Sequence, residues 1–250
     1  MRRYVNRRNF LNILGLSVCL SVVTAVANHT HVTSSSSTSS PRPERTHSCP
    51  SERALNDRIN DLGSQMDAPG AFAARDSLLA SASSSVQCRR KILTALIAAM
   101  QQSPVGAAAE DRKYTLFHNA ERVLAQLKAT EAVDVLMANL TLTDGMSISI
   151  GHFPAVLALI DIGQPAIPKL EVVLNKDPEW SRRKFAAFCI ASIGGTRARR
   201  SLATALPAEK DACVSEFLRS SLRLLNDPRH PNHIVPGNAA FLGPFYCFHD

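Results

Sequence analysis

A turn motif that recurs at a fixed spacing is the feature that most constrains the fold of this 250-residue chain. Ile162-Gly163 and Ile193-Gly194 lie 31 residues apart, and Leu170 and Leu202 follow them seven and eight residues later. A more degenerate copy ends at Leu136, 34 residues before Leu170. Each unit reads as a helix, a tight turn and a second helix. One such pair cannot bury its apolar face alone, so neighbouring pairs are expected to stack into a continuous core.

The apolar residues around these turns recur at helical spacing. Phe117, Ala120 and Leu124 fall on one helix face at i, i+3 and i+7, and no segment sustains the period of two that a half-buried strand requires. Breakers such as Gly163-Gln164-Pro165 and Asp227-Pro228 separate the periodic segments. We therefore predict an all-α fold. The expected helices span 51–66, 70–81, 86–102, 112–128, 130–140, 153–162, 165–175, 179–193, 196–206 and 209–226.

Two segments carry a family resemblance. Residues 158–170 read Ala-Leu-Ile-Asp-Ile-Gly-Gln-Pro-Ala-Ile-Pro-Lys-Leu, and residues 183–195 read Arg-Lys-Phe-Ala-Ala-Phe-Cys-Ile-Ala-Ser-Ile-Gly-Gly. They resemble the HEAT-like repeat family in its short bacterial form. The resemblance covers residues 51–226 and is clearest over 115–225. It implies a right-handed α-solenoid of stacked antiparallel helix pairs that works as a scaffold or protein-binding surface. Some relatives are phycobilin lyases, but no residue here points specifically to a chromophore.

The amino terminus predicts export. A basic start with Arg7 and Arg8 precedes an uncharged stretch over 11–27, and the small residues Ala25 and Ala27 mark a cleavage site. This is the pattern of a signal peptide over residues 1–27. Residues 6–11, Asn-Arg-Arg-Asn-Phe-Leu, resemble the bacterial twin-arginine signal, which implies export of a folded protein to the periplasm or beyond. A general secretory signal and an uncleaved anchor remain alternatives, and only the anchor would attach the chain to the membrane.

Two further segments flank the expected helices. Residues 28–50 form a Ser/Pro-rich leader whose few apolar residues predict a flexible tether. Residues 227–250 contain prolines and a cluster of aromatic residues, so we predict a tail that caps the open end of the solenoid, with a partner-docking peptide as the alternative. Histidines occur in both segments, but none has the spacing of a convincing metal site. We therefore predict no metal and no cofactor.

The five cysteines beyond the signal segment contain no Cys-x-x-Cys motif, which argues against a zinc ribbon or a thioredoxin-like site. Disulfides are expected in an oxidising compartment. We predict a bond between Cys49 and Cys88, which would tie the end of the leader to the helical body. Cys189 lies among apolar neighbours and is interpreted as a buried thiol, whereas Cys213 is placed to reach either Cys189 or Cys247.

A run of basic residues suggests a binding surface. Residues 181–200 contain six cations and no acid, and two more arginines follow in the next unit. If stacking gathers them, they form one positive face for a protein partner; the alternative is an ordinary solvated face. The residues are Arg182, Arg183, Lys184, Arg197, Arg199, Arg200, Arg219 and Arg223.

Composition narrows the function further. The net charge is +7, but four arginines in the first ten residues supply much of it, which argues against a nucleic-acid partner. Aromatic residues make up 6%, too few for an aromatic-lined carbohydrate cleft or a base-stacking platform. No nucleophile elbow, phosphate-binding loop or zinc-protease motif occurs. We expect a non-catalytic, exported scaffold or adaptor that binds a protein. The alternative is an envelope enzyme or enzyme-maturation factor with a bound metal or chromophore.

Overall fold

The computed structural model describes residues 49–102, 109–143 and 150–226, and these residues are all-helical, with no strand among them. The prediction of an all-α fold is confirmed. The predicted signal peptide, nearly all of the leader and the predicted capping tail lie outside the described residues. The α-helices are α1 (Glu52–Leu62), α2 (Pro69–Ser84), α3 (Val86–Gln101), α4 (Ala109–Gln126), α5 (Val133–Ala138), α6 (Pro154–Ile162), α7 (Ile167–Lys176), α8 (Trp180–Ile193), α9 (Gly195–Ala205) and α10 (Ala212–Asn226). Short 3₁₀ turns lie at η1 (Thr130–Ala132), η2 (Ile150–His152), η3 (Gln164–Ala166) and η4 (Leu206–Ala208).

Helix boundaries follow local signals. Ser51 accepts a hydrogen bond from the Ala54 N–H at 3.3 Å and begins α1, and Ser85 accepts one from Cys88 at 3.1 Å and begins α3. Proline stands at the first position of α2 and of α6, where its missing N–H leaves no helical hydrogen bond unmade. In the described part of the chain, ten α-helices match the ten expected segments, with differences of a few residues at most ends.

The largest boundary difference is at α1, which ends at Leu62 and not at residue 66. The Gly63 N–H bonds the carbonyls of Ile59 and Asn60, which closes the last turn. The Asn119 side chain of α4 then donates to the Leu62 carbonyl at 2.7 Å and to the Gln65 carbonyl at 3.0 Å. A buried amide on a distant helix therefore fixes this turn, which local helix propensity alone does not reveal.

The recurring Ile-Gly pairs are structurally equivalent. Gly163 ends α6 with φ 84° and Gly194 ends α8 with φ 70°, and each donates its N–H to the carbonyl four residues earlier. Positive φ is a conformation that glycine adopts without strain. The Gln164 side chain also donates to the Gly194 carbonyl at 2.9 Å, which joins the two turns across neighbouring units. The repeat seen in the sequence is thus a repeat of backbone conformation.

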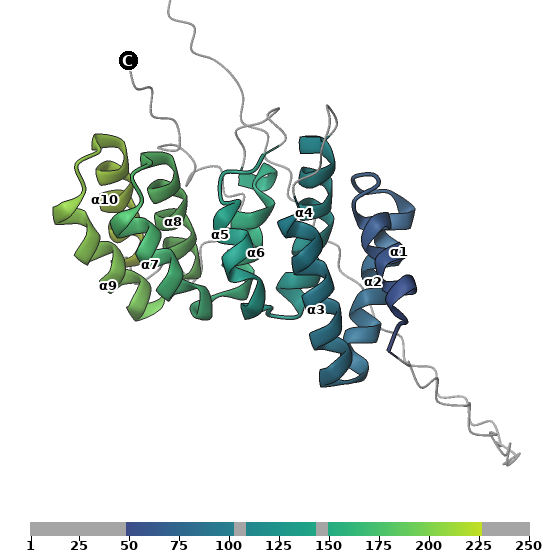
Figure 1. Cartoon of the computed structure of the whole chain (residues 1–250). Helices are drawn as coiled ribbons and strands as arrows, with labels where there is room; N and C mark the ends of the chain where they lie inside the picture. The colour runs from purple at the N-terminus through teal and green to yellow at the C-terminus, as the bar shows by residue number, and fades with distance from the viewer. Residues whose placement is uncertain (1–48, 103–108, 144–149, 227–250) are drawn as a thin grey trace, which may run out of the picture. The chain divides into compact units, whose positions relative to one another are not determined.

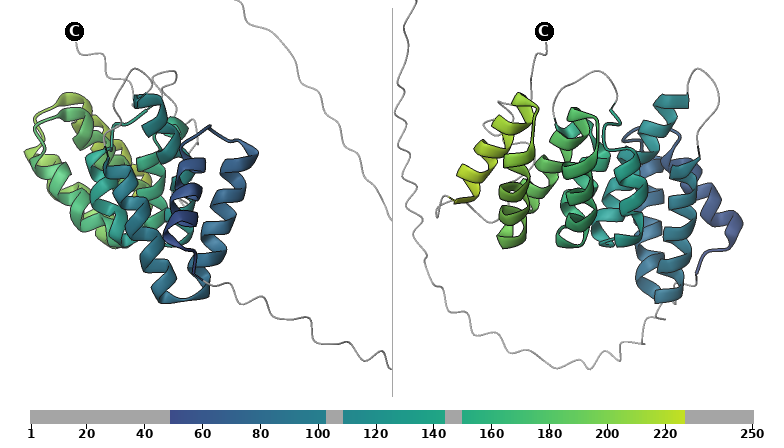
Figure 2. Two further views of the ribbon diagram at one scale, coloured as in Figure 1. Left: turned by 45° about the vertical axis from the view of Figure 1, so that its right-hand side comes forward. Right: turned by 60° about the vertical axis from the view of Figure 1, so that its left-hand side comes forward.

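The helices contact one another in two rows. In one row α2 contacts α4, α4 contacts α6, α6 contacts α8 and α8 contacts α10; in the other, α1, α3, α5, α7 and α9 contact in succession. Figures 1 and 2 show the helices following one another in sequence order. Large apolar side chains of α4, α6, α8 and α10 are almost fully buried, among them Phe117, Leu159, Phe188 and Phe217 at 0–1% exposure. This continuous burial is the main source of stability expected for such an array.

No helix in the described part of the chain is both long and apolar enough to cross a membrane.

Candidate functional site

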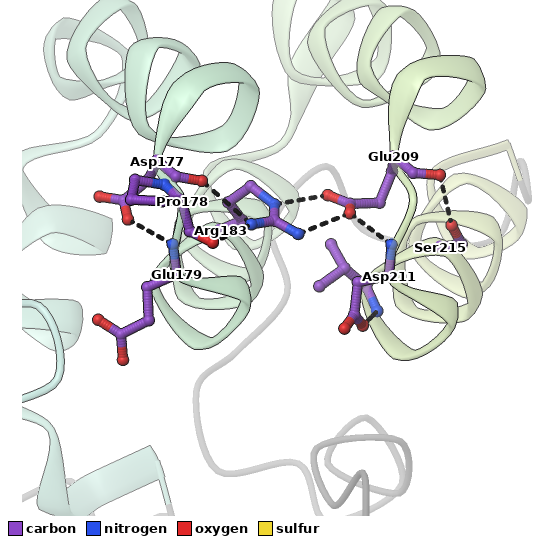
Figure 3. A network of polar contacts seen from close by, with 8 residues as sticks. Asp177, Pro178, Glu179, Arg183, Glu209, Asp211 and Ser215 are labelled. Carbon is purple, nitrogen blue, oxygen red and sulfur yellow. Dashed lines mark hydrogen bonds and ion pairs between the residues drawn. The ribbon is translucent and has the colours of Figure 1, made fainter. Parts of the chain in front are cut away.

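Arg183 lies in a network that joins two neighbouring units (Figure 3). Its Nε and Nη2 atoms donate to the two carboxylate oxygens of Glu209, both at 2.8 Å, and Nη1 donates to the carbonyls of Asp177 and Pro178 at 3.0 Å. The Arg183 and Glu209 side chains are only 15% and 5% exposed. Although burial raises the pKa of Glu209, the hydrogen bonds from Arg183 and from the Asp211 backbone hold that pKa below its usual value.

Arg182 points the other way along the array. Its Nε donates to Asp177 at 2.8 Å, and Nη2 donates to the Met137 carbonyl of α5 at 3.0 Å. Burial raises the pKa of Asp177, but the bonds from Arg182 and from the Glu179 N–H lower it more. Two consecutive arginines of α8 thus reach in opposite directions, each holding a carbonyl group and a carboxylate at a junction between helices.

The basic residues of α9 and α10 are also engaged. Arg197 pairs with Glu171 of α7 at 2.8 Å, and Arg199 donates to the Leu225 carbonyl of α10 at 2.8 Å. The pKa of Glu171 is lowered by its hydrogen bond with Arg197 and, more weakly, by one with Ser201. Two solvent-facing arginines, Arg219 and Arg223, pair with Glu216 on the same helix at 3.4 and 3.2 Å.

Lys184 was predicted to belong to the basic face, but it is only 2% exposed and does not lie on the surface. Its ammonium lies 3.4 Å from the sulfur of Cys213, and burial lowers its pKa to about 8 although Asp211 opposes this shift. A side chain so covered contributes nothing to a surface that a partner meets. Arg200 is exposed and forms no ion pair with any described residue. Most of the predicted basic face is thus locally neutralised or internal, and the eight residues do not form one free positive surface.

A groove between α1 and α3 has a volume of about 1070 Å³. Leu55 and Ile59 line its buried side, and α3 contributes a floor of small residues, Ala95, Ala98 and Ala99. Carboxamides and a hydroxyl line the walls. They are Asn56 and Asn60 on α1 and Gln87, Thr94 and Gln102 on or just beyond α3. Sequence analysis missed this groove. A signal was present, because the uncharged, exposed residues along α3 and just beyond it recur at i, i+7, i+11 and i+15: Gln87, Thr94, Ala98 and Gln102.

A disulfide lies at one end of the groove. Cys49 and Cys88 are bonded, with Cα atoms 5.2 Å apart, which agrees with the predicted pairing. The bond brings the starts of α1 and α3 together. Arg90 and Lys91 line this end, and the Lys91 ammonium donates to the Pro50 carbonyl at 2.9 Å. Glu52 is the acidic residue among the lining groups, so this end carries a small excess of positive charge.

The structure describes two of the other cysteines, Cys189 and Cys213. Cys189 is a buried free thiol whose pKa burial raises, as its apolar neighbours predict. Cys213 is disulfide-bonded, so the alternative that joins it to Cys189 is wrong. The other predicted partner, Cys247, lies outside the described residues.

A small cluster of titratable groups lies on α4, which the sequence analysis did not single out. The His118 Nε2 atom lies 3.3 Å from a carboxylate oxygen of Asp67, and Glu121 stands one turn further along the same helix face. Burial raises the pKa of Glu121 to about 7; the charge of Arg122 lowers it, and those of Asp161 and Asp67 raise it. The Glu121 Oε2 and His118 Nδ1 atoms are buried without a hydrogen-bond partner among the described residues.

These groups do not converge as metal ligands would. Within the described ranges, no group of three or more His, Cys, Asp or Glu side chains has the arrangement to hold a metal ion. The histidines at positions 29, 31, 47, 230 and 233 lie outside those ranges.

Comparison of the chain with models of protein families, with curated proteins and with solved structures finds no match.

Proposed function

We propose that this chain is an exported, non-catalytic scaffold or adaptor that binds a protein partner through the groove between α1 and α3. The groove is the observation that carries the proposal. It is open, it extends over most of α3, and it offers apolar floor atoms and unpaired hydrogen-bonding groups side by side. Protein-binding surfaces combine an apolar centre with a polar rim in this way.

The proposed framework is a right-handed α-solenoid of HEAT-like helix pairs. Three observations support it: the two rows of successive helix contacts, the equivalent turns at Gly163 and Gly194, and the side chains that link neighbouring units. An array of this kind buries each unit against its neighbours and leaves long faces for partners. In this account most of the arginines of the predicted basic face stabilise the array, and the binding surface lies at its amino-terminal end.

Export is the second part of the proposal. The Cys49–Cys88 disulfide agrees with an oxidising compartment. The signal-like sequence over residues 1–27 supports the same destination.

A site-specific photocross-linking experiment tests the proposed binding surface. A benzophenone amino acid is placed at Ala98, an exposed position in the groove, and at Ala203, an exposed position on α9 that serves as the control. Both variants are expressed in the native cell, and adducts of the full chain are identified by mass spectrometry. We expect one defined protein adduct from Ala98 and not from Ala203. The same adducts from both positions, or none from Ala98, would contradict the proposal.

A further inference from the structure

The walls of the α1/α3 groove carry side chains that match the main chain of a peptide. A carboxamide both donates and accepts hydrogen bonds, as a peptide unit does. Asn56, Asn60, Gln87 and Gln102 all face the groove, and none of these side chains forms a hydrogen bond with a described residue. They are therefore available for a ligand that offers alternating N–H and C=O groups.

Spacing favours an extended ligand. Asn56 and Asn60 are one helical turn apart, which places them about 6 Å apart along the axis of α1. Alternate residues of an extended chain are separated by about 6.6 Å. The stripe from Gln87 to Gln102 on the α3 side is about 22 Å long, which accommodates about seven extended residues.

The floor of the groove excludes the usual alternative, a docked amphipathic helix. Such a helix needs deep apolar pockets for large anchors. Here the large apolar residues Leu55 and Ile59 are already 1% and 7% exposed, and the accessible floor consists of Ala95, Ala98 and Ala99. Small side chains allow a main chain to approach closely but offer little apolar area to grip.

Charge gives the ligand a direction. Arg90 and Lys91 lie at the disulfide end, where α1 and α3 both begin. Helix amino termini carry partial positive charge, and this adds to the charge of the two side chains. The Lys91 ammonium uses one of its three donors on the Pro50 carbonyl and retains the others. Glu52 offsets part of this charge, and the amide-lined far end carries none.

We infer that the groove binds an extended peptide segment of about seven residues through its main chain, with a carboxylate of that segment held at the disulfide end by Arg90 and Lys91. The inference rests on the proposed function, since it names the kind of segment that the partner presents. The groove is open, so the segment lies within the partner chain and its carboxylate is an Asp or Glu side chain; a free carboxyl terminus is an outcome that the test distinguishes.

A selection from random heptapeptides tests the inference. The library is displayed in two forms, with a free carboxyl terminus and with the peptide embedded in a carrier, and is selected on the full chain. Peptides that also bind an Ala98→Trp variant, whose groove is filled, are discarded; Ala203→Trp is the matched control. We expect the carrier-embedded form to yield retained peptides that carry an acidic residue at one end and show no helical spacing of large apolar residues.

Two measurements on a retained peptide complete the test. The double charge reversal Arg90→Glu with Lys91→Glu is expected to weaken binding about tenfold or more in fluorescence polarisation, whereas Arg200→Glu leaves it within about twofold. Methylation of alternate backbone nitrogens of the peptide is expected to abolish binding, and methylation of the intervening ones is not. Thermal melting of each variant verifies that it is folded.

The results distinguish the inference from the proposed function. Groove-dependent peptides with no acidic preference, or with large apolar residues at i, i+3 and i+7, would overturn the inference and leave the groove as a protein-binding surface. Failure to recover any peptide that depends on Ala98 would overturn the inference as well, and the cross-linking result at Ala98 would then decide the proposed function separately.

Discussion

Replacing Gly163 by alanine tests whether the repeated Ile-Gly turn requires glycine. Gly163 has φ 84° and ψ −143° at the end of α6. This region is open almost exclusively to glycine, and another residue there costs about 1–3 kcal/mol. A Cβ atom at this position would lie 3.9 Å from the carbonyl oxygens of Ile160 and Asp161, which is ordinary contact. The expected loss therefore comes from the backbone conformation alone and not from a steric clash.

Gly70 provides the matched control for this substitution. It lies in the first turn of α2, and a Cβ atom there meets nothing within 4 Å. Alanine is favoured over glycine in a helix by about 0.5–1 kcal/mol, so Gly70→Ala is expected to leave stability unchanged or to raise it. The same chemical change is thus expected to have opposite effects at the two positions.

Thermal and urea unfolding of the full chain measure the difference. For a chain of this size, 1 kcal/mol corresponds to a Tm change of roughly 2–4 °C. We expect Gly163→Ala to lower the Tm by roughly 2–12 °C, and Gly70→Ala to leave it unchanged or raise it by a few degrees. An unchanged Tm for Gly163→Ala, or an equal fall for both variants, would refute the argument that the turn requires glycine.

Three shorter predictions concern titration, ion pairing and thiol reactivity. The pKa of Glu121 is raised from 4.5 to about 7, so the folded protein binds an extra proton between these pH values and its stability falls as pH rises through them. Glu121→Gln should flatten this decline and stabilise the chain at pH 8. Equal pH profiles of the two chains in urea unfolding would contradict the assignment. Arg183→Ala leaves the Glu209 carboxylate, whose side chain is 5% exposed, without its partner and should cost about 2–4 kcal/mol. Arg223→Ala, with a side chain 74% exposed, should change the free energy of unfolding by less than about 0.5 kcal/mol; similar losses would show that burial does not decide the difference. The buried Cys189 thiol should resist iodoacetamide in the folded chain and react after unfolding, and rapid modification of the native protein would show that it is accessible.

Sequence periodicity predicted the helices well because the signals that define them are local. Serine caps begin α1 and α3, and glycines with positive φ end α6 and α8. The spacing of the Ile-Gly pairs reported a repeated backbone turn for the same reason. The predicted end of α1 was wrong because the amide of Asn119, on a distant helix, fixes the turn that follows Leu62. No pattern within the segment itself reports that contact.

The surface was harder to predict because charge partners are set by packing. Arg183 and Glu209 are 26 residues apart in sequence but bidentate in the structure. The run of cations therefore suggested a free basic face, whereas stacking brings acids and carbonyl groups to most of its arginines. Lys184 illustrates the same limit, since its position directly after two arginines gives no sign that it is buried.

The groove was missed for a different reason. Its lining comes from α1 and α3, which are separated by α2 in the sequence and brought together by packing and by the Cys49–Cys88 bond. The Cys49–Cys88 pairing was predicted from the expected oxidising compartment and from the place of Cys49 at the end of the leader, but the position of the bond at one end of the groove was not predicted. Uncharged exposed residues such as Thr94 and Ala98 also attract less notice in a sequence than arginines do.

The affinity of the partner captured at Ala98 is the measurement that tests the proposed binding role most directly. The purified partner is titrated into the wild-type chain and into the Ala98→Trp and Ala203→Trp variants by isothermal titration calorimetry. If the α1/α3 groove is the binding surface, Ala98→Trp weakens binding by about a hundredfold or abolishes it, and Ala203→Trp binds as the wild type does. Equal affinity for all three chains would contradict the proposed function.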